Sequence, residues 1–233
     1  MSELTPKHRA AEAATHEIQS DMRLGLGSGS TVNLIAAALG ARVARGEVSG
    51  VRVVVASHWT EAVVRAAGLT LTTLDETPQL DLALDGADEI DPQRAMIKGG
   101  GGALLRERIV LAAADQRVIV VDESKLVRVL GERFSVPVEV VPFGWRVAAL
   151  RLRQLGVKPV RREVPAFEYG MGPTQPLVTD EGNYIFDCAF GPIADPAALD
   201  RTLRAIPGVM DHGLFLNVSA RLLVGGPSGV REL

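Results

Sequence analysis

Cysteine is almost absent from this chain, which holds a single one, Cys188, so no internal disulfide can form. A chain without disulfides suits a reducing compartment, and we expect a cytoplasmic protein. Cys188 ends a short, mostly apolar run of residues 184–188 that is typical of a strand. We therefore expect its thiol to be buried in a core rather than reactive.

Long apolar and long basic stretches are missing as well. No run approaches the ~18 consecutive apolar residues of a membrane span, and residues 1–7 lack the apolar segment of a secretory signal peptide. No run of about five Lys or Arg occurs, and the formal net charge is -3. Neither a membrane nor a nucleic acid is therefore an expected partner, and an anionic ligand would need a local cluster of donors.

The 233 residues, 47% hydrophobic and 23% charged, suffice for one large or two small globular domains. Strands and helices alternate through the first half, an order typical of an α/β domain with a largely parallel sheet. The run 51–56 is nearly continuously apolar, as expected for a strand buried on both faces. Strands are predicted at residues 22–26, 51–56, 69–74, 80–84 and 118–121, and helices at 5–19, 31–44, 57–67 and 103–114.

The pattern changes after about residue 131. Strands are predicted at residues 136–141, 158–162, 183–188 and 209–216, helices at 145–155 and 196–205, and a loop at 165–176. The order β-α-β-β-α-β is that of a ferredoxin-like unit, and residues 221–224 are predicted to return to the first sheet. We therefore expect an α/β protein with a Rossmann-like, mostly parallel sheet domain (1–130 and 217–233) and a second, smaller ferredoxin-like α+β domain (131–216).

Polar clusters occur at four predicted strand ends, where ligands of open parallel sheets bind. The first, Gly-Leu-Gly-Ser-Gly-Ser-Thr at residues 25–31, is a glycine-rich turn whose backbone N–H groups could hold phosphate. It departs from the dinucleotide fingerprint because Ser30 replaces the third glycine and Ser57-His58, not an acid, ends the next strand. No Gly-Lys-Ser/Thr of a P-loop follows. The turn fits a small phosphate better than a nucleotide, and a plain tight turn is the alternative.

The second cluster is Asp85-Gly86-Ala87-Asp88-Glu89-Ile90-Asp91. Two acids three residues apart can face one pocket from a turn, where they could bind sugar hydroxyls or move protons. A metal site competes with this interpretation, but the spacing does not match an EF-hand and no histidine lies nearby to suggest zinc. A solvated acidic turn is the other alternative.

The third cluster joins Lys98 and four consecutive glycines, 99–102, to a predicted helix that carries Glu107. Consecutive glycines cost backbone entropy, which suggests close approach of a ligand. The residues three and four positions from Glu107 are all apolar: Ala103, Leu104, Val110 and Leu111. Glu107 is thus predicted on the buried stripe, where an apolar setting would raise its pKa toward the range of a general base. A structural ion pair with Arg106 or Arg108 is the alternative.

The fourth cluster is Asp122-Glu123-Ser124-Lys125, which could cap a helix and place Lys125 either at a ligand or in solvent. The histidines show no ligand spacing and no evident carboxylate partner, so each is expected on the surface or in the core. They are His8, His16, His58 and His212.

In this order, the clusters resemble the signatures of ribose-5-phosphate isomerase type A over nearly the whole chain. The resemblance rests on Gly27-Ser28-Gly29-Ser30-Thr31, Asp85-Gly86-Ala87-Asp88-Glu89, Lys98-Gly99-Gly100-Gly101 and Arg106-Glu107, with Val136-Pro137-Val138-Glu139-Val140 and Ile206-Pro207-Gly208-Val209 in support. Ser28 stands where threonine is common in that family, and Gly102 stands where alanine is common.

The resemblance implies interconversion of D-ribose 5-phosphate and D-ribulose 5-phosphate through an enediolate, in the pentose phosphate pathway and without metal or other cofactor. It implies that Glu107 is the proton acceptor, with Asp85 and Lys98 as further catalytic groups, and that Lys7 approaches the phosphate. It also implies a homodimer or a dimer of dimers. The implied substrate contacts are Ser28, Gly29, Ser30, Thr31, Asp85, Gly86, Ala87, Asp88, Lys98, Gly99, Gly100, Gly101 and Lys125.

Two other functions are compatible with such a fold. A sugar-phosphate-sensing module would bind without turnover, but it would usually carry a DNA-binding helix-turn-helix, and the segment before the first strand leaves no room for one. An acyl-CoA transferase would use a nucleophilic glutamate, and a thioester on Glu107 would identify it.

Overall fold

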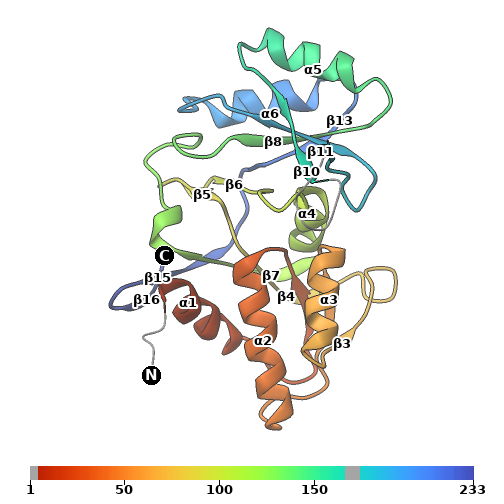
Figure 1. Cartoon of the computed structure of the whole chain (residues 1–233). Coiled ribbons are helices and arrows are strands. Elements are labelled where there is room, and N and C mark those ends of the chain that lie inside the picture. Colours follow the sequence, from red (N-terminus) through yellow and green to blue (C-terminus); the bar gives the residue numbers. More distant parts are fainter. Residues whose placement is uncertain (1–4, 166–173) are drawn as a thin grey trace. The chain divides into compact units, whose positions relative to one another are not determined.

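The computed structural model describes residues 5–165 and 174–233, which form two compact units (Figure 1). The first comprises the described chain up to Ala87 with Arg106–Leu126 and Val218–Leu233, and the second comprises Asp88–Leu105 and Val127–Asn217. Residues 88–105 group with the second unit, whereas the boundary drawn from the sequence assigns them to the first domain. That boundary stays a prediction.

A seven-stranded sheet forms the centre of the first unit, in the order β16-β15-β7-β4-β1-β2-β3. All neighbouring strands are parallel except β15 and β16, which confirms the mostly parallel sheet. The inner strands are largely buried, as is typical of parallel strands in α/β proteins. The strands are β1 (Arg23–Leu26), β2 (Arg52–Val55), β3 (Thr70–Leu71), β4 (Leu80–Asp85), β7 (Ala114–Asp122), β15 (Arg221–Gly226) and β16 (Gly229–Glu232).

The helices of this unit are α1 (Pro6–Thr15), α2 (Ser30–Ala44), α3 (His58–Ala66) and most of α4 (Leu104–Ala112), with a short 3₁₀ turn, η1 (Glu123–Lys125). Helix α2 packs against α1 and α3, and the three lie side by side in Figure 1. Thr5 caps α1, and the helix ends at Thr15 rather than at the predicted residue 19. Arg42 of α2 donates to the carbonyls of Thr15 and Ile18, at and just after the end of α1.

A four-stranded antiparallel sheet, in the order β13-β8-β12-β9, dominates the second unit. Its strands are β8 (Val136–Val140), β9 (Val160–Arg161), β12 (Tyr184–Cys188) and β13 (Val209–His212), and its helices are α5 (Trp145–Gln154) and α6 (Pro196–Arg204). The succession β-α-β-β-α-β is the predicted ferredoxin-like one. Val138, Phe186, Leu152 and Leu203 share the core between helices and sheet, and the alternate residues of β8 and β12 point to the other face.

The predicted strand 209–216 is wrong in one respect, because it is interrupted at Gly213. After β13, the chain forms β14 (Leu214–Phe215), which pairs with β6 (Met96–Ile97) in a three-stranded sheet with β5 (Glu89–Ile90). The N–H of Gly213 donates to Pro137 O of the four-stranded sheet, while its own carbonyl accepts from Lys98 N–H after β6. Gly213 therefore leads the chain from one sheet to the other.

The predicted loop 165–176 is wrong at both ends. There β10 (Glu163–Pro165) pairs antiparallel with β11 (Thr174–Pro176). A proline is tolerated in such a ribbon because an edge strand does not need every N–H for pairing. Residues 166–173 of the predicted loop lie outside the described residues.

Candidate active site

The carboxyl ends of two neighbouring strands, β1 and β4, bring Gly27 and Asp85 together in the first unit. The N–H of Gly27 donates to Leu84 O at 3.0 Å, and a Cβ on Gly27 would lie only 2.0 Å from the Asp85 carboxylate. Asp85 is 1% exposed, and its Oδ1 accepts from Gly86 N–H at 2.7 Å. Position 27 must therefore lack a side chain for this carboxylate to lie against the strand end.

Hydroxyl groups tie the turn after β1 to helix α3. Ser28 Oγ lies 2.9 Å from Ser57 Oγ, which also accepts from Thr60 N–H at 3.0 Å as the cap of α3. Thr60 Oγ1 donates to Gly27 O at 3.0 Å. These bonds fix the turn in front of α2.

A cation lies at the N-terminus of α2. Lys7 Nζ of α1 donates to Ser30 Oγ at 3.1 Å, and Ser30 is the first residue of the helix. The backbone N–H groups of a first helical turn have no partner within the helix and attract anions, so this end is chemically suited to phosphate. Thr31 lies beside Gly86, with its Oγ1 4.0 Å from a Cβ built on that glycine. The first and second predicted clusters are therefore neighbours.

Helix α4 buries a carboxylate among apolar side chains, as the spacing predicts. Glu107 is 3% exposed, and Leu104, Val110 and Leu111 on the same stripe are buried too. Val110, one turn after Glu107, packs on β1, where its Cγ1 would lie 2.6 Å from a Cβ on Gly25. This close packing of α4 on the sheet gives Glu107 a fixed backbone.

Lys125 ends η1, directly after the carboxyl end of β7, the sheet neighbour of β4. Asp122 caps this 3₁₀ turn, which is one of the alternatives for the cluster, because its Oδ1 accepts from Ser124 N–H at 3.0 Å. Lys125 is half-buried. Within the described part of the chain, no hydrogen bond or ion pair joins it to the other candidate residues.

In the second unit, Lys98 is a buried cation, 2% exposed, directly after β6. Its N–H donates to Gly213 O at 2.9 Å, and its Nζ lies 5.4 Å from the centroid of the Phe215 ring. The face of an aromatic ring attracts a cation, which offsets part of the cost of burying the ammonium group.

The glycines after Lys98 form a turn that is bonded to Asp88. Gly99 adopts φ 101, and its carbonyl accepts from Gly102 N–H at 3.0 Å. Gly100 N–H donates to Asp88 Oδ2 at 2.8 Å, and a Cβ on Gly100 would lie 2.8 Å from Asp88 Oδ1. Asp88 N–H in turn donates to Ile97 O at 2.8 Å. Asp88 therefore fixes the turn, a role that sequence reasoning did not assign to it.

Sequence reasoning missed two further groups around this turn. Arg162 donates from Nη1 to the carbonyls of Gly99 and Gly100, at 3.0 Å each. The buried Glu89 accepts from the backbone N–H groups of Gly131, Arg133 and Phe134 at 2.6 to 2.7 Å. Glu89 stands within a predicted cluster, but nothing in its spacing indicated partners more than forty residues away.

The expectation that His212 has no carboxylate partner is wrong. His212 is fully buried, and its Nε2 lies 3.2 Å from Asp200 Oδ1 of α6. The expectation of a core histidine is confirmed for this residue.

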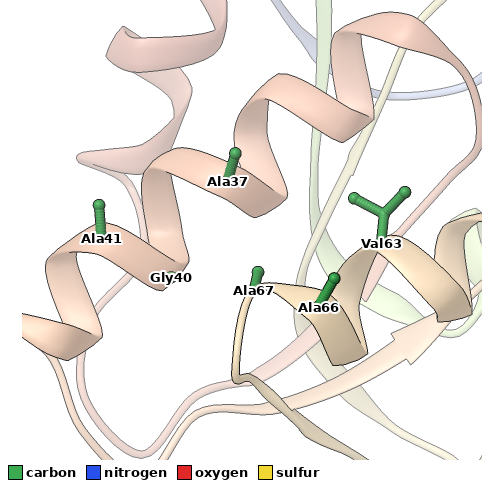
Figure 2. Close-up of a pocket in the computed structure, with 6 residues that line it drawn as sticks. All are labelled: Ala37, Gly40, Ala41, Val63, Ala66 and Ala67. Atoms are coloured by element: carbon green, nitrogen blue, oxygen red, sulfur yellow. The ribbon is translucent and has the colours of Figure 1, made fainter.

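One hollow of the first unit does not offer comparable chemistry. A hollow of about 330 Å³ between α2 and α3 is lined by Ala37, Gly40, Ala41, Val63, Ala66 and Ala67 (Figure 2). None of these side chains carries a charge or a hydrogen-bonding group. Among residues 5–165 and 174–233, no three His, Cys, Asp or Glu side chains gather as a metal site would require, and no helix is long and apolar enough to cross a bilayer.

Known proteins resemble this chain over nearly its full length. Residues 52–229 match the family described as ribose 5-phosphate isomerase A (phosphoriboisomerase A). The ribose-5-phosphate isomerase A of Roseiflexus castenholzii is 49% identical, covering 97% of this chain and 94% of its own, and that of Thermomicrobium roseum is 46% identical, covering 97% and 92%. The solved ribose 5-phosphate isomerase A of Methanocaldococcus jannaschii superposes with a TM-score of 0.89 at 37% identity, covering 98% and 97%. A D-ribose-5-phosphate isomerase solved in complex with phospho-erythronic acid superposes with a TM-score of 0.89 at 35% identity, covering 98% of this chain and 97% of its own.

Proposed function

The chain belongs to the ribose 5-phosphate isomerase A family, and on this premise we propose that it interconverts D-ribose 5-phosphate and D-ribulose 5-phosphate in the pentose phosphate pathway. The observation that carries the mechanism is the Glu107 carboxylate, buried on the apolar stripe of α4. The reaction moves a proton between C2 and C1 of the open-chain sugar and needs one base that reaches both carbons. A buried carboxylate on a packed helix is suited to that task, since its position is fixed and water is excluded.

Lys98 and the glycine turn are proposed to stabilise the oxygen that becomes negative in the enediolate. Donors that are already oriented toward a developing charge lower the barrier because they need no reorganisation during the reaction. The buried ammonium group of Lys98 and the backbone N–H groups of Gly99 and Gly101 are proposed as these donors, since the N–H of Gly100 already donates to Asp88 Oδ2.

The two acids of the second cluster receive different proposed roles. Asp85, buried at the end of β4, would assist ring opening or move protons between sugar oxygens. Asp88 would hold sugar hydroxyls with the acceptor capacity that its bond to Gly100 N–H leaves over. It would thereby link substrate binding to the shape of the glycine turn.

For the phosphate group, the N-terminus of α2 is the better-supported binding site. It offers the N–H groups of the first helical turn, the hydroxyls of Ser28, Ser30 and Thr31, and the ammonium group of Lys7, 3.1 Å from Ser30 Oγ. Gly29 shapes the turn in front of the helix with φ 110. Lys125, Gly86 and Ala87 are proposed as further substrate contacts, and their positions after β7 and β4 are compatible with that role.

A homodimer or dimer of dimers in the cytoplasm is proposed as the working form. Phe143 is 96% exposed, and Val147 and Leu150 of α5, one turn apart, are 58% and 53% exposed. Such neighbouring apolar side chains favour contact with another subunit. The single, buried cysteine supports a reducing compartment. Light scattering at micromolar concentration tests the assembly.

The function is tested by following ribulose 5-phosphate formation from ribose 5-phosphate with purified protein in EDTA. We expect turnover that EDTA leaves unchanged, since the proposed groups are all side chains and backbone donors of this chain. Binding of ribose 5-phosphate without turnover would overturn the proposal in favour of a sensing module. A thioester on Glu107 after incubation with acyl-CoA, detected by mass spectrometry, would favour a transferase.

A further inference from the structure

A single guanidinium group holds two carbonyls of the glycine turn. Arg162 follows β9, and its Nη1 donates to Gly99 O and Gly100 O at 3.0 Å each. Its other edge faces Asp187 of β12, to which Nε donates at 3.0 Å and Nη2 donates as well. The arginine therefore bridges the sheet and the turn with donors from both edges of its planar group.

These bonds determine where the N–H groups of the turn point. A trans peptide is planar, and its C=O and N–H point in opposite directions. When Gly99 O faces Arg162, the N–H of Gly100 faces away from it, toward Asp88, to which it donates at 2.8 Å. When Gly100 O faces Arg162, the N–H of Gly101 likewise faces away from the guanidinium. Glycine peptides rotate easily, so these orientations need an external constraint.

We propose that Arg162, held by Asp187, is a positioning residue that fixes the glycine turn and orients the N–H of Gly101 for the negative oxygen of the enediolate. This inference rests on the proposed function and deepens it. Arg162 touches no reacting atom, and Asp187 balances its charge, so its effect comes from geometry rather than from added positive charge. Its contribution should therefore be felt in the transition state more than in the bound sugar phosphate.

The requirement is for arginine and not for any cation. One side chain must donate to Asp187 from one edge and to two carbonyls from the other, which matches the five N–H donors of a planar guanidinium. The three donors of a lysine radiate from a single nitrogen and cannot span both groups. Arg162→Lys thus keeps the charge while it removes the bridge.

The neighbouring arginine provides a matched control. Arg161 lies on the opposite face of the strand, 4.9 Å from the Trp145 ring centroid and 5.5 Å from that of Tyr184. Its side chain is 25% exposed and that of Arg162 is 15% exposed, so the two are similarly buried. Arg161→Lys changes the same chemistry in the same unit without touching the glycine turn.

The experiment compares wild type, Arg162→Lys, Asp187→Asn and Arg161→Lys. We expect Arg162→Lys to lower kcat about tenfold to hundredfold, somewhat less than the loss of an oxyanion donor, with KM changed less than about threefold. Inhibition by phospho-erythronic acid, whose carboxylate resembles the enediolate, should weaken about tenfold or more, while inhibition by inorganic phosphate stays unchanged. Arg161→Lys should keep wild-type values, and Asp187→Asn should show the same pattern as Arg162→Lys in weaker form.

Hydrogen exchange at the amides of residues 100–102 gives a readout that does not depend on turnover. These amides should exchange faster in Arg162→Lys than in wild type or Arg161→Lys. If Arg162→Lys does not fold, Asp187→Asn carries the same comparison. If wild type is active and Arg162→Lys keeps the wild-type kcat, or loses activity only through a higher KM, the positioning role is overturned. The isomerase proposal then remains intact. An inactive wild type overturns the isomerase proposal and this inference with it.

Discussion

Gly27→Ala should be among the most damaging small substitutions in the first unit. The new Cβ would lie 2.0 Å from Cγ and Oδ1 of the buried Asp85, so the carboxylate must move. Forcing a methyl group into a packed site costs about 1–3 kcal/mol. Displacing Asp85 from Gly86 N–H, at 2.7 Å, leaves buried polar groups without partners at a further ~1–3 kcal/mol. Together these effects predict that the free energy of unfolding falls by about 2–6 kcal/mol.

Urea unfolding and steady-state kinetics test this prediction together. The matched control is Gly46→Ala, at an exposed glycine with φ 71 and nothing within 4 Å of its Cβ position. There the left-handed backbone alone should cost about 1 kcal/mol, with activity retained. Gly27→Ala should lose activity as well, because Asp85 is displaced from its proposed catalytic position. A Gly27→Ala protein with wild-type activity, and less destabilised than Gly46→Ala, would refute the placement of Asp85 against Gly27.

Three further predictions concern charge and burial. Lys7→Met should raise KM and weaken inhibition by inorganic phosphate about tenfold, with kcat little changed, because Lys7 adds a cation at Ser30 and the α2 N-terminus. An unchanged inhibition constant for phosphate would argue against a phosphate site at this helix end. Burial raises the pKa of the Glu139 carboxyl, and Asp211 adds repulsion. A raised folded pKa favours the protonated form, so stability is lost as pH rises through it. Glu139→Gln should therefore stabilise the protein at pH 7, with no difference below about pH 4 in urea unfolding; a destabilised variant at pH 7 would contradict this. Burial raises the pKa of the Cys188 thiol to about 12, so it should resist iodoacetamide at pH 8 until the protein unfolds, and rapid native labelling would contradict its placement.

The elements that the sequence predicts well are those whose hydrogen bonds or burial repeat over several residues. The apolar runs of β1, β2, β4 and β7 are long enough to show a pattern. The start of α1 is indicated locally, because Thr5 is a residue type that caps helices and Pro6 is favoured at the first helical position. Two-residue strands are different: β6 and β14 pair across more than a hundred residues, as Ile97 does with Leu214. A pair of residues carries too little periodicity to indicate such pairing.

The same limit applies to the candidate site. Glu107 could be predicted as buried because the signal lies within one helix, at spacings of three and four residues. Arg162 could not, because it contacts carbonyls more than sixty residues away, and nothing in its own segment distinguishes it from Arg161. Every residue has a backbone carbonyl, so the residue type does not indicate which carbonyl accepts a hydrogen bond from a distant side chain. Positioning contacts of this kind become visible only in the structure.

Glu107 is proposed to move the proton between C2 and C1 of the sugar. This role is tested most directly by two measurements on wild type, Glu107→Gln and the control Ile109→Gln. The first is kcat with ribose 5-phosphate as substrate, and the second is the affinity for phospho-erythronic acid. Ile109 lies on the same helix but is 48% exposed, so its replacement should leave both quantities unchanged. We predict that Glu107→Gln lowers kcat at least about 10²-fold while the inhibitor binds within about threefold of wild type. A Glu107→Gln protein that keeps more than about a tenth of wild-type turnover would contradict the account, because general-base catalysis is worth ~10²–10⁴-fold.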